Sequence, residues 1–152
     1  MRLDDRDRRI LTLLQEDSRM SNADLAEAVG MSASALWRRV RSLEEAGVIK
    51  RYGAVVVPQA MGLNFEALVQ VNLTRHAPEH LQEFIRAVEG NPHVVECYAT
   101  TGQADYHLRI LAPDLEAYNQ FLEQFLFQLA GVASAQTHVI LKTVKRDTPV
   151  VP

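Results

Sequence analysis

The sequence predicts an α+β protein made of two parts, an N-terminal helix-turn-helix domain of the winged type and a C-terminal ferredoxin-like domain with the order βαββαβ. Two observations lead to this prediction. Short helical patterns separated by turn signals fill residues 1–51, and strictly alternating apolar residues begin at residue 65. We expect domains at 1–51 and 65–152, joined by a strand and hinge linker at 52–64.

The first two helices are predicted from their start and stop signals. Asp4 can cap a first helix that ends near residue 16. Ser21 opens a second helix, residues 22 to 29, with a motif that resembles a capping box. Gly30 then supplies a tight turn, and a turn of this length between two short helices is typical of a helix-turn-helix.

The third helix carries its own signals at both ends. Ser32 is a good N-cap, and Gly47 suits the left-handed position after the last turn. Leu36, Val40 and Leu43 recur at the spacing of one buried face. This pattern predicts an amphipathic helix packed against the first two.

The opposite face of this helix is basic. Ser34, Trp37, Arg38 and Arg41 project from it, with Arg39 towards one edge. Guanidinium groups pair with phosphates and guanine edges, and short serines allow close approach in a DNA major groove. Such a face on a charged helix alone would be read as solvated surface, but the preceding turn and helix favour DNA binding.

Basic residues also follow the third helix. Lys50 and Arg51 lie before an expected strand, Ala54 to Val57, where they would contact the phosphate backbone or stay as ordinary solvated charge. The predicted partner is double-stranded DNA. The candidate DNA-binding residues are Ser32, Ser34, Trp37, Arg38, Arg39, Arg41, Lys50 and Arg51.

The C-terminal domain follows an alternating strand and helix pattern. Two predicted helices would cover one face of an antiparallel sheet, and Cys97 would be a small core residue. Leu68, Tyr98 and Ile140 would point to the uncovered face, which implies a partner such as a second subunit. The predicted elements are a strand at 65–73, a helix from Pro78 to Gly90, strands at 94–100 and 105–111, a helix capped by Asp114 and ending by Gly131, and a strand at 135–144.

The loop between the second and third strands has the chemistry of an amino-acid site. Gly102 allows a tight turn that brings backbone N–H groups towards a carboxylate. Asp105 offers a carboxylate for an α-ammonium, and neighbouring threonines add hydroxyls. A plain β-turn with an aspartate cap is the alternative that the spacing favours on its own.

Composition limits the remaining classes. The net charge is −3, but residues 1–62 hold ten Lys and Arg against nine Asp and Glu, whereas residues 63–152 hold six against ten. No apolar run is long enough for a membrane span, no signal peptide is visible, and a single cysteine fits a reducing cytosol. We expect a cytoplasmic protein that does not bind a membrane.

Motifs from both halves together resemble the leucine-responsive/asparagine-regulator (Lrp/AsnC) family of transcription regulators. The matching pieces are Leu3-Asp4-x-x-Asp7-x-x-Ile10-Leu11, Leu25-Ala26, Val29-Gly30-Met31-Ser32, Arg38-Arg39-Val40, Leu43-Glu44-x-x-Gly47-Val48-Ile49 and Thr101-Gly102-x-x-Asp105-Tyr106.

The resemblance implies a C-terminal amino-acid-sensing domain, dimers that assemble further into octamer-like rings, and an effector bound between dimers. It places the effector at Thr101, Gly102, Asp105 and Thr137. Two departures stand out. Gln103-Ala104 lacks the bulky or charged residues often found in this loop, and Trp37 is large for a residue that faces a DNA groove.

Two other functions stay open from sequence. A DNA-compacting protein that ignores metabolites would keep the basic helix and the assembly. The haem-pathway decarboxylases resemble the same two-part architecture, but the five histidines here are scattered and no catalytic set is present. His76 and His80 straddle Pro78, which argues against a metal site. We expect no enzyme activity, no metal and no cofactor.

Overall fold

The computed structural model describes residues 2–74 and 78–151, which form two compact units. The first, here called the helical unit, comprises Met1–Val55 with Lys145–Pro152, and the second, the sheet unit, comprises Val56–Val144. The chain therefore passes between the units twice. The expected boundaries at residues 51 and 65 stay a prediction, and the grouping of the last residues with the helical unit was not expected.

The helical unit contains three helices. Its core consists of a few fully or nearly fully buried side chains from all three of them, supported by partly buried neighbours. The helices are α1 (Asp5–Glu16), α2 (Asn22–Ala28) and α3 (Ala33–Glu45). The core residues are Ile10, Leu25, Ala26, Leu36 and Leu43.

The predicted helix starts are confirmed by their caps. The Asp4 side chain accepts the Asp7 N–H, and the Asp7 side chain accepts the Asp4 N–H, which is a reciprocal capping box. Ser21 and Ser32 cap α2 and α3 through their hydroxyl oxygens. Each start was predictable because a cap is a local interaction between residues three apart.

The strand predicted at Ala54 to Val57 is wrong, since the described residues between α3 and residue 57 form none. Val55, Val56 and Val57 leave 74%, 59% and 63% of their surface exposed. A β-strand needs a partner for its backbone N–H and C=O groups, and this segment has no partner strand in the described chain. A short 3-10 helix, Pro58–Met61, follows it.

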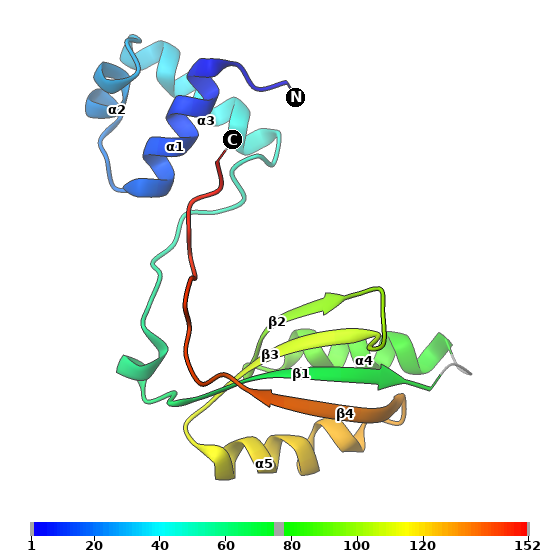
Figure 1. Ribbon diagram of the computed structural model, residues 1–152. Coiled ribbons are helices and arrows are strands. Elements are labelled where there is room, and N and C mark those ends of the chain that lie inside the picture. The colour runs from blue at the N-terminus through cyan, green and yellow to red at the C-terminus, as the bar shows by residue number, and fades with distance from the viewer. Residues whose placement is uncertain (1, 75–77, 152) are drawn as a thin grey trace. The chain divides into compact units, whose positions relative to one another are not determined.

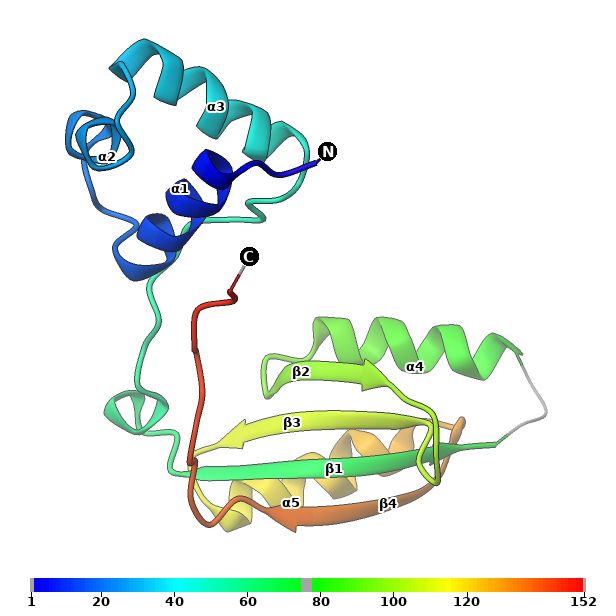
Figure 2. The same ribbon diagram turned by 45° about the horizontal axis from the view of Figure 1, so that its top comes forward.

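The sheet unit has the predicted βαββαβ order. Each strand of its four-stranded sheet is antiparallel to its neighbours, in the order β2-β3-β1-β4. The elements are β1 (Phe65–Leu73), α4 (Pro78–Gly90), β2 (Val94–Ala99), β3 (Tyr106–Ala112), α5 (Leu115–Gln124), a short 3-10 helix (Leu126–Gln128) and β4 (Val132–Val139). Figures 1 and 2 show the two helices alongside this sheet.

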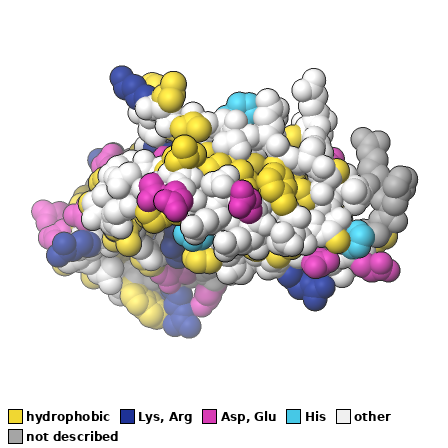
Figure 3. All heavy atoms as spheres, turned by 90° about the horizontal axis from the view of Figure 1, so that it is seen from below, with side chains coloured by type: hydrophobic (Ala, Val, Ile, Leu, Met, Phe, Trp, Pro, Cys, Tyr) yellow, Lys and Arg dark blue, Asp and Glu magenta, His cyan; other side chains and the backbone are white. Residues whose placement is uncertain are grey.

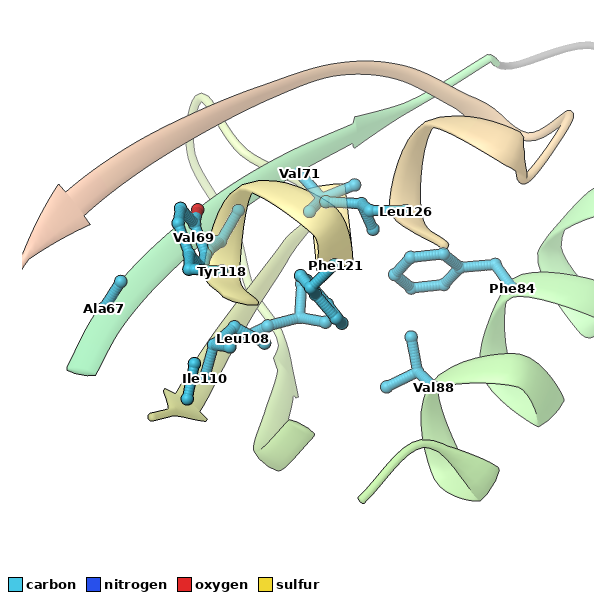
Figure 4. Close-up of a cluster of buried hydrophobic side chains, with 11 residues drawn as sticks. Ala67, Val69, Val71, Phe84, Val88, Leu108, Ile110, Tyr118, Phe121 and Leu126 are labelled. Atoms are coloured by element: carbon cyan, nitrogen blue, oxygen red, sulfur yellow. The ribbon is translucent and has the colours of Figure 1, made fainter. Parts of the chain in front are cut away.

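The core of the sheet unit lies between one face of the sheet and both helices. Alternate residues of β1 and β3 meet the aromatic and aliphatic side chains of α4 and α5 (Figure 4). The central cluster includes Ala67, Val69, Val71, Phe84, Val88, Leu108, Ile110, Tyr118, Phe121 and Leu126. The other face of the sheet has no helix over it within the described residues.

Three details of the sheet unit differ from the prediction. The last strand covers 132–139 rather than 135–144, because its pairing with β1 ends where Ile140 donates to the carbonyl of Glu66. Cys97 is exposed rather than in the core, because β2 is an edge strand. The spacing of Leu81 and Ile85 in the sequence predicts that both lie on the inner face of the helix, but in α4 they remain 38% and 37% exposed.

Candidate nucleic-acid interface and effector loop

The third helix has one buried face and one exposed polar face. Ser32 Oγ accepts the N–H of Ala35 at 3.3 Å, and Gly47 ends the helix with a φ of +70°. Leu36 and Leu43 are completely buried against α1 and α2. This fixed inner face holds the opposite side of the helix in solvent.

The exposed face carries most of the predicted DNA-binding residues. The guanidinium of Arg38 forms no hydrogen bond or ion pair with any residue that the structure describes. Ser34 is exposed beside it, and its hydroxyl lies 3.3 Å from that of Ser32. Arg38 therefore presents an unpaired cation to an external partner.

Trp37 and Arg41 form a pair on the same face. The Arg41 guanidinium lies 5.3 Å from the centre of the Trp37 ring, and Arg41 Nε donates to Glu45 at 2.8 Å. Trp37 is 51% exposed. The side chain thus stays on the outer surface, where it supports Arg41 instead of entering the core.

Arg39 is placed differently from the other predicted contacts. Its guanidinium donates to Asp4 Oδ2 at 2.6 and 2.7 Å and to Asp7 Oδ1 at 3.0 Å. The hydrogen bond from the Asp7 N–H is the main cause that lowers the pKa of Asp4. Desolvation opposes it, and the hydrogen bond and the charge of Arg39 add to the lowering. This geometry favours an internal contact for Arg39 rather than a direct DNA contact.

Lys50 and Arg51 are both exposed in the segment after α3. Nearby, the Tyr52 hydroxyl donates to Glu44 at 2.8 Å. Burial and this hydrogen bond raise the pKa of Tyr52 to about 12, so Tyr52 stays a neutral donor. The two basic side chains remain available at this end of the helical unit.

The predicted effector loop has the backbone that its glycine suggested. Gly102 has a φ of +116°, which L-residues with a side chain rarely adopt. The Thr100 hydroxyl donates to the carbonyl of Ala104 at 3.1 Å, which closes the loop. Thr101 and Gly102 are exposed at its tip.

Asp105 anchors the loop to the central strand. Its Oδ2 accepts the N–H of Leu73 at 2.8 Å, and its own N–H donates to the carbonyl of Val71. The other oxygen, Oδ1, has no hydrogen-bond partner in the part of the chain that the structure describes. One oxygen is therefore structural, and the other can accept a ligand N–H.

A groove of about 460 Å³ lies beside Asp105. Apolar and aromatic side chains make up most of its wall, and these were not among the predicted site residues. Leu73 belongs to a strand predicted from its alternation, and Pro78 and Leu81 belong to a predicted helix, so the sequence pattern gave no sign of a cavity between them. The lining residues are Leu73, Thr74, Pro78, Leu81, Thr100, Asp105 and Tyr106.

Thr137 does not join this groove. It lies on β4 opposite Val69 and its hydroxyl is 2.5 Å from that of Tyr118. Thr101 and Gly102 are not part of the lining either. Within one chain, therefore, the structure brings Asp105 to the groove and leaves the other three predicted effector residues outside it.

The open face of the sheet combines apolar and charged side chains. Leu68 and Tyr98 are 42% and 56% exposed there. Arg109 Nε donates to Glu66 at 2.5 Å and its Nη1 donates to Glu96 at 2.8 Å. Burial disfavours the charged form of Arg109, but these hydrogen bonds outweigh it and raise its pKa.

No helix in the described part of the chain is both long and apolar enough to cross a membrane. Residues 2–74 and 78–151 contain no group of three or more histidine, cysteine, aspartate or glutamate side chains that could hold a metal ion. His76, which together with His80 is predicted not to form a metal site, lies outside the described residues.

A helix-turn-helix with a basic outer face, joined to a ferredoxin-like domain, defines a DNA-binding regulator with a ligand-binding domain. Two family models agree with this class. The winged helix-turn-helix DNA-binding model matches residues 3–50, and the Lrp/AsnC ligand binding domain matches residues 66–150. The chain belongs to the Lrp/AsnC family of transcription regulators.

Individual relatives support the same assignment. The transcriptional regulator AzlB of Bacillus subtilis is 36% identical over 148 residues, which cover 97% of this chain and 94% of that protein. The leucine-responsive regulatory protein of Escherichia coli K12 is also 36% identical, with 98% and 91% covered.

A solved structure is similar over nearly the whole chain. It is a transcriptional regulator from Neisseria meningitidis in complex with L-methionine, 35% identical, with a TM-score of 0.93 and 98% and 96% of the two chains covered. The predicted fold class and family are confirmed, and the relatives are regulators rather than enzymes.

Proposed function

We propose that this regulator binds double-stranded DNA through the exposed face of α3. The unpaired guanidinium of Arg38 is the observation that carries this proposal, because an exposed cation on a helix anchored by a buried inner face suits a groove edge. The contacts that we propose are Ser32, Ser34, Trp37, Arg38 and Arg41 in the groove, with Lys50 and Arg51 on phosphates.

A selection experiment tests this proposal. Duplexes from a randomised pool are enriched on the full-length protein and sequenced. A symmetric dimer predicts a pseudo-palindromic site whose half-sites lie one helical turn, about 10 base pairs, or a multiple of it apart. A pool that shows no enriched sequence after repeated rounds would contradict sequence-specific recognition.

We infer that the sheet unit binds a free amino acid at the loop of Thr101, Gly102 and Asp105. Asp105 Oδ1 is available for the α-ammonium, and the turn at Gly102 exposes backbone for the α-carboxylate. The apolar walls of the groove favour an uncharged side chain. The methionine complex of the Neisseria meningitidis relative supports this ligand class.

Thr137 fits this site only as a residue from a neighbouring subunit. Its hydroxyl is engaged with Tyr118 in the same chain, and it does not line the groove beside Asp105. A site completed between subunits would connect ligand binding to assembly. This is the arrangement that we propose for Thr137.

The open face of the sheet is the proposed dimer surface. Leu68 and Tyr98 expose apolar area there, and a second copy of the same face would cover it around a two-fold axis. Apolar side chains also reach the surface elsewhere, in a band with acidic side chains beside it (Figure 3). Association of dimers into larger rings, such as octamers, is part of the same proposal.

A thermal-shift assay with each of the twenty amino acids tests the effector proposal. A ligand present at a hundredfold excess over its Kd stabilises the folded state by about 2.7 kcal/mol. We expect a rise in Tm with a small set of uncharged amino acids, and its loss in Asp105→Asn. Asparagine keeps an oxygen for the Leu73 N–H, so the folded loop is retained.

Asp114→Asn is the matched control for this assay. Asp114 caps α5 by accepting the Ala117 N–H, and asparagine caps equally well while changing the charge by the same amount. Its ligand response should equal that of the parent. Silence of the parent across the whole panel would favour a DNA-organising protein without an amino-acid effector.

A further inference from the structure

Asp4, Asp7 and Arg39 form a closed network, here called the Asp–Asp–Arg network. Each carboxylate uses one oxygen for the helix cap and the other for the guanidinium. Asp4 Oδ1 and Asp7 Oδ2 accept backbone N–H groups of the capping box. Asp4 Oδ2 and Asp7 Oδ1 accept from Arg39.

Burial makes this network more than a surface ion pair. Asp7 is only 3% exposed and the Arg39 side chain 29%, while Asp4 stays open to solvent. A carboxylate as buried as Asp7 requires a paired charge and complete hydrogen bonding. The Arg39 guanidinium, which comes from a different helix, supplies the paired charge, and together with the Asp4 N–H it completes the hydrogen bonding of Asp7.

The network connects the first turn of α1 to the middle of α3. Arg39 lies on a different face of α3 from the residues directly before and after it. The guanidinium of Arg38, the residue before it, has no partner among the described residues. Successive residues on an α-helix are about 100° apart, so fixing Arg39 also fixes the direction of Arg38. Both arginines line one depression of about 560 Å³.

We propose that Arg39 is a positioning residue for DNA recognition, which sets the rotation of α3 through Asp4 and Asp7 without touching DNA. The proposal rests on the proposed function, in which the exposed face of α3 meets the groove. It assigns different roles to two adjacent arginines.

The proposal predicts a change in DNA affinity that is opposite in sign to the change that charge alone would cause. Replacing Asp4 by asparagine removes a negative charge close to the recognition helix, and charge alone would tighten DNA binding. Asparagine is also a good N-cap, so α1 keeps its start. The positioning role instead predicts weaker binding, because the guanidinium of Arg39 loses its principal acceptor.

The test uses the full-length protein and two duplexes, one selected by the parent from a randomised pool and one with the same bases shuffled. Fluorescence anisotropy gives affinities at several salt concentrations for the parent, Asp4→Asn and Arg39→Ala. We expect both variants to bind the selected duplex roughly tenfold more weakly, the equivalent of one lost base contact, with the shuffled duplex and the salt slope unchanged.

Asp5→Asn is the matched control. Asp5 lies beside Asp4 in the first turn of α1, is exposed, and changes the charge equally without disturbing the network. It should bind the selected duplex at least as well as the parent. If Asp4→Asn behaves like Asp5→Asn, the positioning role is overturned.

A direct phosphate contact by Arg39 would give a different result. Arg39→Ala would then weaken both duplexes and reduce the slope of log K against log salt by about 0.9. Should Asp4→Asn fail to fold, as judged by its melting curve, Arg39→Lys replaces it. Lysine keeps the charge but cannot bridge two carboxylates, so the positioning role predicts the tenfold loss and a phosphate contact predicts none.

The proposed function fails separately. If Arg38→Ala binds the selected duplex as tightly as the parent, the exposed face of α3 does not meet DNA. If Arg38→Ala weakens binding and Asp4→Asn does not, the recognition face stands and the positioning role of Arg39 is wrong.

Discussion

Arg38 on α3 and Arg109 on β3 carry the same side chain in opposite surroundings. Arg38 is exposed and has no partner among the described residues. Arg109 lies between Glu66 and Glu96, and its side chain is 13% exposed. The difference indicates two roles for arginine. An arginine paired with carboxylates of its own chain stabilises the fold, whereas an unpaired arginine on a rigid helix indicates an external anion.

The surfaces around these arginines differ in the same way. The outer face of α3 is polar and basic, which suits DNA. The open face of the sheet has its charges satisfied internally and leaves Leu68 and Tyr98 exposed, which suits a second protein surface. One molecule therefore presents two faces whose chemistry suits two different kinds of partner.

The largest expected effect is the difference in stability between variants that lack Arg109 and variants that lack Arg38. Arg109→Ala removes the charged hydrogen bonds that this guanidinium donates to Glu66 and Glu96, and should lower the free energy of unfolding by about 1.5–3 kcal/mol. Arg38→Ala should change it by no more than about 0.5 kcal/mol. Urea denaturation measures both, and equal effects would contradict the assigned roles.

A smaller effect is expected on association through the sheet face. Leu68→Glu places a charge on the proposed dimer surface and should weaken the dimer roughly tenfold or more, because an apolar anchor is lost and a charge is desolvated. Sedimentation velocity at several concentrations measures this. Leu115→Glu, on a leucine of α5 that is 64% exposed against 42% for Leu68, is the control, and it should leave the dimer intact. The reverse result would place the interface on the helices.

The smallest effect is a pH dependence of the helical unit. The pKa of Asp4 is below its ordinary value of 3.8 in the folded protein, mainly through the Asp7 N–H. Its contribution is therefore fully present above pH 3.8 and is lost as the pH falls through the lower, folded value. Melting curves between pH 5 and 2 should show a smaller acid loss in Asp4→Asn than in the parent. An identical profile would show that Asp4 gains nothing from its partners.

The helices were largely predictable from sequence because their signals are local. Ser32 and Asp114 mark the helix starts, because each side chain accepts a hydrogen bond from the N–H three residues ahead. Gly47 ends α3 with its left-handed backbone. Strand β1 was also predictable from a local pattern, because burial of one face of the strand makes its apolar residues alternate along the sequence.

The errors come from interactions between distant residues. The apolar segment at residues 54–57 resembled a strand, but a strand also needs a neighbour. Cys97 shares the alternation of its strand, but the alternation does not reveal that β2 is at the edge of the sheet. The pairing of Arg39 with Asp4 and Asp7 joins residues more than thirty positions apart, so composition and spacing placed Arg39 with the DNA contacts.

The measurement that tests the central claim most directly is the affinity of Arg38→Ala for the selected duplex, compared with the parent at equal salt. We predict a loss of about 1–3 kcal/mol in binding free energy, with relaxed discrimination at one base pair and an unchanged melting temperature. Binding as tight and as selective as that of the parent would show that the unpaired arginine of α3 does not meet DNA, and the comparison between Arg38 and Arg109 would fail.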